Sequence, residues 1–234
     1  MSGPPAAGSF AARAVLAAER LACRRGERLV FAELSCRLPA GGALILTGAN
    51  GSGKSSLLRL FATLLAPAAG RLLWGGAPVA ADLPSYRARL HYVGHSDAVK
   101  PALSPRETLA FWAALRGPAT PPADPGGAVE AALHAFGLDR VADWPCRWLS
   151  AGQRRRLALA RLAASAAPVW LLDEPSAALD EDGAARLEAA IVAHRAIGGR
   201  VAIATHLPIA VGPAERLALD DFAPASGHPL ALGF

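Results

Sequence analysis

Cysteine is scarce in this sequence, and the closely spaced pairs that bind metals are missing. The three cysteines, Cys23, Cys36 and Cys146, form no C-x-x-C motif and no evident metal-binding cluster. We therefore expect buried or inert thiols, as in the proteins of a reducing compartment.

Long apolar runs are also lacking. No stretch approaches the roughly 18 uncharged apolar residues that predict a membrane-spanning helix, although 53% of the 234 residues are hydrophobic. The first ten residues lack the charged start and the apolar core of a secretory signal. We expect a cytosolic chain with one domain, or one core with a smaller lobe, that does not itself span a bilayer.

Charge is sparse, since charged residues make up 18% of the chain. The net charge of +5 permits association with anionic lipid or nucleic acid, yet the basic block that stands out is Arg154-Arg155-Arg156. We interpret this block as mostly a solvated or packing face of a helix. We expect no nucleic-acid partner.

The residues from Gly48 to Ser55 fit the phosphate-loop pattern G-x-x-x-x-G-K-[ST]. The apolar run Ala43–Thr47 before it is typical of a buried parallel strand, and a helix is predicted after it. Glycines let successive backbone N–H groups turn towards one anion, and a helix N-terminus favours negative charge. The sequence therefore predicts a nucleoside triphosphate site formed by Gly48, Ala49, Asn50, Gly51, Ser52, Gly53, Lys54, Ser55 and Ser56.

Two side chains of this loop have distinct expected tasks. Lys54 can reach the outer phosphates, and the hydroxyl of Ser55 can bind Mg²⁺. The predicted strand 169–174 delivers two acids, Asp173 and Glu174, at its carboxyl end, where ligands gather in parallel α/β sheets. His206 follows the next predicted strand directly, and this position indicates a functional histidine.

The remaining pattern predicts an α/β fold whose first strands form the antiparallel beginning of a mixed sheet. A capping box at Ser104-Pro105-Arg106-Glu107 predicts the start of a helix. The predicted strands are 15–22, 28–31, 34–38, 44–47, 71–74, 89–93, 169–174 and 200–205. The predicted helices are 56–65, 105–115, 128–136, 153–166 and 184–196.

We divide the chain into three parts. Residues 1–13 are rich in Pro, Ala and Gly and predict a flexible tail. Residues 14–211 are expected to form a single domain with a helical subdomain over about 97–166, which includes a Pro- and Gly-rich loop at 117–127. Residues 212–234 are Pro-rich and weakly patterned, so we expect a C-terminal extension and predict no element within it.

Taken in order, the motifs resemble those of ABC-type ATPases, the nucleotide-binding subunits of ATP-binding cassette transporters. Gly48–Ser55 resembles Walker A, and Leu149-Ser-Ala-Gly-Gln153 resembles the LSGGQ signature with Ala151 in place of its first glycine. The resemblance implies a P-loop NTPase of the ABC type, with a mixed sheet core, an antiparallel N-terminal part and a helical subdomain. Further matches are Val169–Asp173 with Walker B, Glu174 with the catalytic acid, Ser176–Asp180 with the D-loop and His206 with the switch histidine.

This resemblance implies ATP hydrolysis assisted by Mg²⁺. Asp173 would hold the ion through water, together with Ser55. Glu174 would orient and polarise the attacking water as a general base, because phosphoryl transfer depends mainly on positioning and charge neutralisation. His206 would bond the γ-phosphate and the neighbouring D-loop, which contains Asp180.

A head-to-tail homodimer is also implied, in which each ATP lies between Walker A of one subunit and the signature helix of the other. Ser150, Gly152 and Gln153 would then act on the partner's nucleotide, and the helix N-terminus after Gly152 would supply donors to the γ-phosphate. Ser150 is expected to cap that helix as well.

Two positions depart from the transporter pattern. His95 stands where the Q-loop glutamine is expected near the metal, and a histidine that is protonated near neutral pH would weaken coupling to the ion. The usual adenine-stacking aromatic is missing near Arg24-Arg25-Gly26. Arg25 is expected to stack on the base through its guanidinium plane instead.

Shorter matches narrow the resemblance to the ATP-binding subunits of the haem exporter of cytochrome c maturation, the CcmA family. In that family the subunit is peripheral on the cytoplasmic side of the inner membrane, pairs with an integral membrane permease, and hydrolyses ATP to release a haem-loaded periplasmic chaperone. The resemblance implies the same location, partner and role here. The matches are Leu21-Ala-Cys23 with Arg25, Trp74-x-Gly76, Tyr92–His95, Leu103–Trp112, Arg155–Arg161 and Pro168-Val-Trp170.

Three alternatives stay open at this point. The first is the ATPase of a transporter with another cargo. The second is a soluble ABC ATPase that acts on ribosomes or DNA, although 234 residues leave no room for a second cassette or a long coiled-coil insertion. The third is a non-hydrolysing scaffold, which Glu174 and His206 argue against and which Ala151 and His95 leave open.

Overall fold

The strands of the protein fall into two sheets, one antiparallel and one parallel, in a computed structural model that describes residues 14–116 and 125–224. The antiparallel sheet has the order β2-β1-β4-β5, and the parallel sheet has the order β6-β7-β8-β3-β9. The strands of the first are β1 (Leu16–Arg25), β2 (Arg28–Leu38), β4 (Ala69–Trp74) and β5 (Ala77–Pro78). Those of the second are β3 (Ala43–Thr47), β6 (Leu90–Val93), β7 (Val169–Asp173), β8 (Arg200–Ala204) and β9 (Glu215–Ala218).

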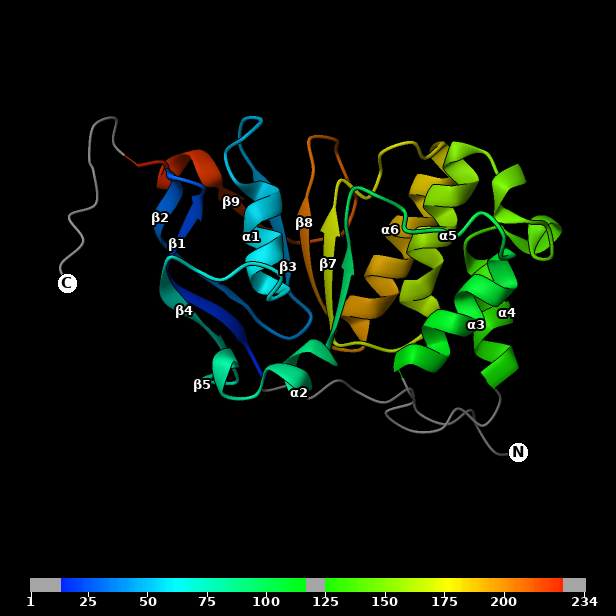
Figure 1. The fold of residues 1–234 in the computed structure, drawn as a ribbon, viewed down its shortest axis with the longest axis horizontal. Coiled ribbons are helices and arrows are strands. Elements are labelled where there is room, and N and C mark those ends of the chain that lie inside the picture. Colours follow the sequence, from blue (N-terminus) through cyan, green and yellow to red (C-terminus); the bar gives the residue numbers. More distant parts are fainter. Residues whose placement is uncertain (1–13, 117–124, 225–234) are drawn as a thin grey trace.

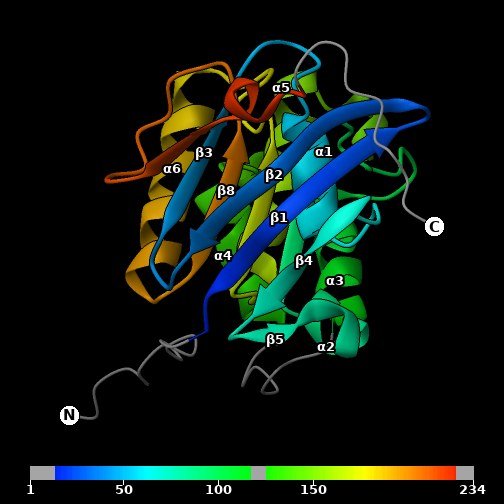
Figure 2. The ribbon, with the colours of Figure 1, turned by 90° about the vertical axis from the view of Figure 1, so that its left-hand side faces the viewer.

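Helices lie on both faces of the parallel sheet (Figure 1). No helix in the described ranges combines the length and the apolar character that a membrane span requires. The antiparallel sheet covers α1 from its other side, as the turned view shows (Figure 2). The helices are α1 (Lys54–Phe61), α2 (Leu83–Arg87), α3 (Pro105–Arg116), α4 (Pro125–Ala135), α5 (Ala151–Ala164) and α6 (Glu181–Ala196), with single 3₁₀ turns η1 (Val79–Ala81), η2 (Asp139–Val141), η3 (Cys146–Trp148) and η4 (Leu219–Phe222).

Two hydrophobic clusters hold these layers together, one on each face of the parallel sheet. Leu44 and Leu46 of β3 join the cluster shared with α1 and the antiparallel sheet, whereas Ile45 joins the cluster shared with α5 and α6. Successive side chains of a strand point to opposite faces, so a strand covered on both sides must be apolar throughout. The unbroken apolar runs in the sequence follow from this arrangement.

The antiparallel and parallel strands were expected in one mixed sheet, but they form separate hydrogen-bonded sheets. The chain leaves β2 at Pro39 and turns through Gly41, which has a φ of 70°, before β3 begins. The two predicted strands 28–31 and 34–38 are one strand, β2, in which Glu33 has a left-handed φ of 53°. An irregularity of this kind strengthens the local twist and hides the strand's continuity in the sequence pattern.

Two other boundaries differ from the prediction. The helix expected over 56–65 is α1, which begins earlier and ends at Phe61, because Thr63 adopts a φ of 55° and turns the chain. Beyond residue 211, where no element was predicted, β9 pairs with β3 and η4 follows. The parallel sheet therefore continues past the predicted domain boundary.

Candidate functional site

The phosphate loop connects β3 to α1, and its glycines have backbone conformations that other residues rarely adopt. The φ angles of Gly48, Gly51 and Gly53 are 131°, 84° and 107°. A Cβ atom at Gly53 would lie 2.7 Å from Cγ1 of Val30 and 2.9 Å from Cδ1 of Phe31. Strand β2 thus packs directly against the loop, and glycine is required at position 53.

Lys54 is 7% exposed, and its amino group is directed back over the loop. Its Nζ donates hydrogen bonds to the carbonyl oxygens of Gly48, at 2.7 Å, and Ala49, at 3.0 Å. Ala49, Asn50 and Gly51 are exposed at the loop tip. The remaining loop residues are half-buried Ser52 and Ser55 and buried Ser56.

Ser55 and Asp173 meet although they are 118 residues apart in the sequence. The hydroxyl of Ser55 donates to Oδ1 of Asp173 at 2.9 Å, and Asp173 is 3% exposed at the end of β7. Hydroxyl and carboxylate oxygens are ligands that Mg²⁺ prefers, usually completed by water and substrate phosphates. No group of three or more His, Cys, Asp or Glu side chains that could hold a metal occurs in the described part of the chain. This oxygen pair therefore fits an ion held jointly with a nucleotide.

Glu174 and His206 lie side by side beyond the ends of β7 and β8. Glu174 has a left-handed φ of 46°, and its backbone N–H donates to the carbonyl of Ala204 at 2.8 Å. The backbone N–H of His206 donates to Oε2 of Glu174 at 3.4 Å, and His206 Nε2 is 3.6 Å from Glu174 Oε1. The bent chain thus turns the carboxylate towards His206, two residues beyond β8.

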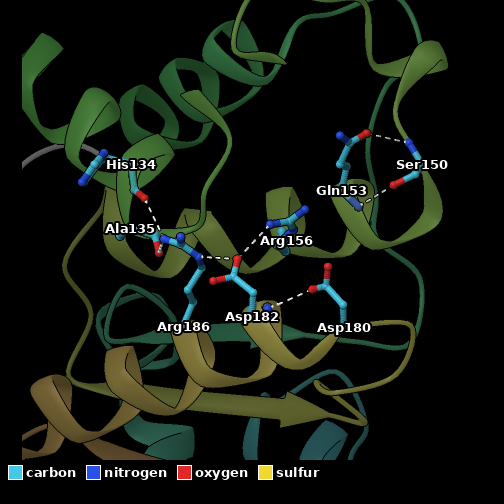
Figure 3. Close-up of polar contacts among 9 residues, drawn as sticks. His134, Ala135, Ser150, Gln153, Arg156, Asp180, Asp182 and Arg186 are labelled. Carbon is cyan, nitrogen blue, oxygen red and sulfur yellow. Dashed lines mark hydrogen bonds and ion pairs between the residues drawn. The ribbon is translucent and has the colours of Figure 1, made fainter. Parts of the chain in front are cut away.

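The signature segment forms the start of α5, as Figure 3 shows. The Oγ of Ser150 accepts from the backbone N–H of Gln153 at 3.2 Å, and Gln153 Oε1 accepts from the N–H of Ser150 at 2.8 Å. This capping box confirms the predicted cap at Ser150. No hydrogen bond joins Ser150, Gly152 or Gln153 to the phosphate loop among the described residues, so one chain does not bring the two motifs together.

The D-loop touches the signature helix of its own chain. A Cβ atom at Gly152 would lie 3.1 Å from the carbonyl oxygen of Ala178, which itself has a φ of 63°. Asp180 ends this loop as the N-cap of α6, accepting from the N–H of Gly183 at 2.9 Å (Figure 3). The second glycine of the signature therefore makes room for the D-loop.

His95 and Arg25 lie at the edges of this arrangement. His95 is exposed in the segment after β6, and in the described residues it makes no hydrogen bond or ion pair with Ser55 or Asp173. Arg25 is exposed at the end of β1, paired across the hairpin with Arg28. The metal role of His95 and the base-stacking role of Arg25 stay predictions.

The three cysteines are free and buried, as expected. Burial raises the pKa of the Cys36 thiol to about 12, with Glu215 adding to the effect. Cys23 and Cys146 also have raised pKa values because burial disfavours their thiolate forms. These thiols are poor nucleophiles.

Two polar residues were not assigned to the site from the sequence. Arg155 was expected on a solvated or packing face of its helix; it packs, since it is 2% exposed, and its guanidinium donates to the end of β7. Its helical spacing from buried Ala158, Leu159 and Leu162 was the available signal. Asp220 was not predicted at all, and its carboxylate accepts from the N–H of Ala49 at 3.1 and 3.3 Å.

Known proteins resemble this chain over most of its length. The model of the ABC transporter family matches residues 31–177. The cytochrome c biogenesis ATP-binding export protein CcmA of Rhodospirillum rubrum is 56% identical over 221 residues, which cover 94% of this chain and 92% of that protein. The protein of the same name from Paramagnetospirillum magneticum is 54% identical over 212 residues, covering 91% and 97%.

Solved structures agree in fold at much lower identity. An ATP-binding subunit of an ABC transporter has a TM-score of 0.74 at 22% identity, over 82% of this chain and 80% of its own. A putative ABC transporter ATP-binding protein from Pyrococcus furiosus has a TM-score of 0.77 at 21% identity, over 90% and 100%. The chain is thus a nucleotide-binding ATPase of the ABC transporter family, and it belongs among the cytochrome c biogenesis ATP-binding export proteins CcmA.

Proposed function

We propose that this protein hydrolyses ATP to power the haem-handling step of cytochrome c maturation, either release of a haem-loaded chaperone or haem export. The observation that carries the proposal is the meeting of the phosphate loop, the Ser55–Asp173 pair and the Glu174–His206 pair at one edge of the parallel sheet. Identity of 56% to a relative named for cytochrome c biogenesis supports the pathway.

Nucleotide binding follows from the loop and its lysine. Backbone N–H groups of the glycine-rich loop and the N-terminus of α1 would hold the phosphates. Lys54 would exchange its bonds to the carbonyls of Gly48 and Ala49 for phosphate oxygens, so its position is prepared before ATP arrives. Ser55 and Asp173 would hold Mg²⁺, which when bound neutralises charge on the phosphates.

Hydrolysis depends on Glu174, which would orient the attacking water and accept its proton on a carboxylate oxygen. The bent backbone and the N–H of His206 hold that carboxylate at the end of β7. His206 would bond the γ-phosphate through its ring, and so respond to the presence of that group. Glu174 directly follows β7 and His206 lies two residues beyond β8, and Asp173 and Ala204 at the ends of these strands pair with each other, which restricts the spacing of the two side chains.

The signature residues would complete the site of a second copy of the chain. Ser150, Gly152 and Gln153 make no hydrogen bond with the phosphate loop in the described parts of their own chain, and they lie at the N-terminus of α5, where backbone donors favour phosphate. A head-to-tail homodimer satisfies both observations. An integral membrane permease of the cytochrome c maturation system would bind this dimer at the cytoplasmic side of the inner membrane.

Replacing Glu174 with Gln tests the proposed hydrolysis. Glu174→Gln keeps the shape of the side chain but removes the general base, so ATPase activity should fall at least 100-fold while ATP binding persists and an ATP-dependent dimer accumulates. Glu130→Gln, on the exposed face of α4, is the control and should retain full turnover. Undiminished turnover in Glu174→Gln would remove Glu174 from its proposed role.

The pathway needs a separate experiment, because every ABC ATPase shares this chemistry. The tagged full-length protein would be purified from detergent-solubilised membranes of its source, and its partners identified by mass spectrometry. Recovery of cytochrome c maturation membrane proteins supports the haem pathway. Recovery of another permease leaves the ATPase in place and rejects the cargo, while ribosomes or nucleic acid without a membrane protein would reject the transporter role.

A further inference from the structure

Arg155 is a buried cation that the proposed chemistry does not use. It lies in the second turn of α5, and its side chain is 3% exposed. A buried charge is costly unless its hydrogen-bonding groups are satisfied. All five N–H groups of a guanidinium can donate, and in Arg155 they make five hydrogen bonds with the main chain and one carboxylate.

Three of these bonds go to successive carbonyl groups at the end of β7. Nη2 donates to the carbonyl oxygens of Asp173 at 3.1 Å and Glu174 at 2.7 Å, and Nε donates to that of Pro175 at 3.2 Å. Three consecutive carbonyls meet one group here because the chain bends at Glu174, where φ is 46°. Such a backbone angle is strained in a residue with a side chain and persists only where the surroundings hold it. Arg155 supplies that hold.

The other branch of the guanidinium reaches the segment after β6. Nη1 donates to the carbonyl of Gly94 at 3.0 Å and to Oδ1 of Asp97 at 3.2 Å. Gly94 and Asp97 flank His95, the residue at the Q-loop position. One side chain therefore joins the segment carrying His95 to the turn carrying Glu174.

The helix that carries Arg155 also carries the signature residues. Ser150 caps α5 five positions before Arg155, and Gly152 packs against Ala178 of the D-loop in the same chain. A shift of the turn at Glu174 would therefore reach the signature residues through the first turns of α5. Packed elements with few alternative arrangements transmit displacements of this kind.

We infer that Arg155 is a positioning residue that couples the two nucleotide sites of the dimer. It holds Glu174 of its own site and, through α5, orients Ser150 to Gln153, which would serve the site of the second copy. The inference rests on the proposed function, because only a head-to-tail dimer gives the signature residues a nucleotide to act on. A lysine can replace Arg155 only in part, since one ammonium group lacks the planar fork that binds the turn at Glu174 and the segment after β6 together.

Kinetics of full-length variants test the positioning role. Arg155→Gln should lower kcat at least tenfold and change the Kd for ATP less than twofold, because none of the five bonds involves the phosphate loop. The kcat of Arg155→Lys should lie between that of Arg155→Gln and that of the wild type. The matched control is Arg186→Gln, which loses the same charge and similar bonds, to Asp182 and the carbonyls of His134 and Ala135 (Figure 3), and should keep kcat.

Two results of these measurements would overturn the positioning role. One is a kcat for Arg155→Gln within twofold of wild type. The other is a loss of ATP affinity as large as the loss of kcat. Thermal unfolding will show whether Arg155→Gln is folded. If it is not, the test rests on Arg155→Lys, and a wild-type kcat in that variant would reject the positioning role of Arg155.

Mixed dimers test the coupling. Two differently tagged full-length copies, one wild type and one Arg155→Gln, would be co-expressed and isolated as a pair in the presence of ATP. If the two sites are coupled, the mixed pair should turn over ATP at less than a quarter of the wild-type rate. If they are independent, it should retain one half of that rate, and this result would reject the coupling. A pair of wild-type and Arg186→Gln chains is the control. The dimer itself is tested separately by Glu174→Gln. If that variant forms no dimer in the presence of ATP, the proposed dimer is wrong, and the coupling between its two sites is rejected as well.

Discussion

At Gly51 and Gly53 the phosphate loop has the same backbone handedness but different surroundings. Both have a positive φ, and an L-residue pays about 1–2 kcal/mol for such an angle. A Cβ at Gly51 would meet open space, whereas one at Gly53 would overlap Val30 and Phe31 of β2. Comparing the same substitution at Gly51 and at Gly53 therefore separates the effect of backbone strain from the effect of the contact with β2.

We predict that the Kd of Gly53→Ala for an ATP analogue is at least ten times that of Gly51→Ala. Neither Val30 nor buried Phe31 can move without disturbing the core, so the loop must shift instead. Fluorescence titration of the full-length variants measures the difference. Equal affinities would show that β2 does not set the shape of the loop.

Individual residues of the site differ in how far the sequence could predict them. Lys54 and Ser55 follow from a fixed local spacing, so their placement beside the loop required no knowledge of the fold. Asp173 could be predicted from the end of an apolar strand. The burial of Arg155 could be suspected from its helical spacing from apolar residues, but its role could not, because the carbonyl groups that it binds are brought to it by the fold.

At the scale of elements, the last turn of α6, just before β8, contains a buried histidine. The ring of His194 stacks on Trp170 of β7 with 3.8 Å between centroids, and a Cβ at Gly199 would lie 2.2 Å from Nε2 of His194. Burial lowers the pKa of His194 to about 4, with the charge of Arg200 adding to the effect and a backbone hydrogen bond involving Arg200 opposing it. The fold thus holds this imidazole neutral.

Stability should fall in acid because of His194. Between pH 6.5 and 4 the unfolded chain binds a proton at this residue and the folded chain does not, so the free energy of unfolding decreases as the pH falls through that window. The loss reaches about 3 kcal/mol at pH 4 and is absent above pH 6.5. Urea unfolding at pH 7.5 and pH 5 measures the part of this loss that is reached at pH 5, about 2 kcal/mol.

His194→Phe keeps a ring against Trp170 and removes the titrating group, so its stability should depend less on pH over this window than that of the wild type. His134→Phe, at an exposed position on α4, is the control and should leave the dependence unchanged. The same slope in His194→Phe and wild type would assign the acid sensitivity to other groups.

Elements with strong local signals were predictable, and those that depend on partners were not. The helix at 105–116 was predicted from its capping box, in which Ser104 and Glu107 exchange hydrogen bonds at 2.8 and 3.2 Å. Strand β9 has four residues, and Glu215 and Arg216 are exposed, so its pattern is not that of a core strand. Its place in the sheet comes from pairing with β3, which the local sequence does not encode.

For the whole molecule, β9 and η4 close one edge of the parallel sheet beside the phosphate loop. Leu217 is 8% exposed and Leu219 is fully buried, both in the cluster that contains α1. Asp220 binds the N–H of Ala49 from the same turn. The nucleotide loop therefore depends on residues near the C-terminus as well as on its own motif.

A chain that ends after Gly212 should consequently be strongly destabilised, in contrast to the domain boundary predicted at residue 211. It loses two buried leucines, worth about 1.5–3 kcal/mol each, and leaves β3 as an unpaired edge. We expect the free energy of unfolding to drop by about 3–6 kcal/mol, a large share of the total stability of a domain. A chain that ends after Pro224 keeps β9 and η4, and urea unfolding should find it about 3–6 kcal/mol more stable than the chain that ends after Gly212. Equal stability of the two shortened chains would mean that the domain is complete at residue 211 and that β9 adds nothing to it.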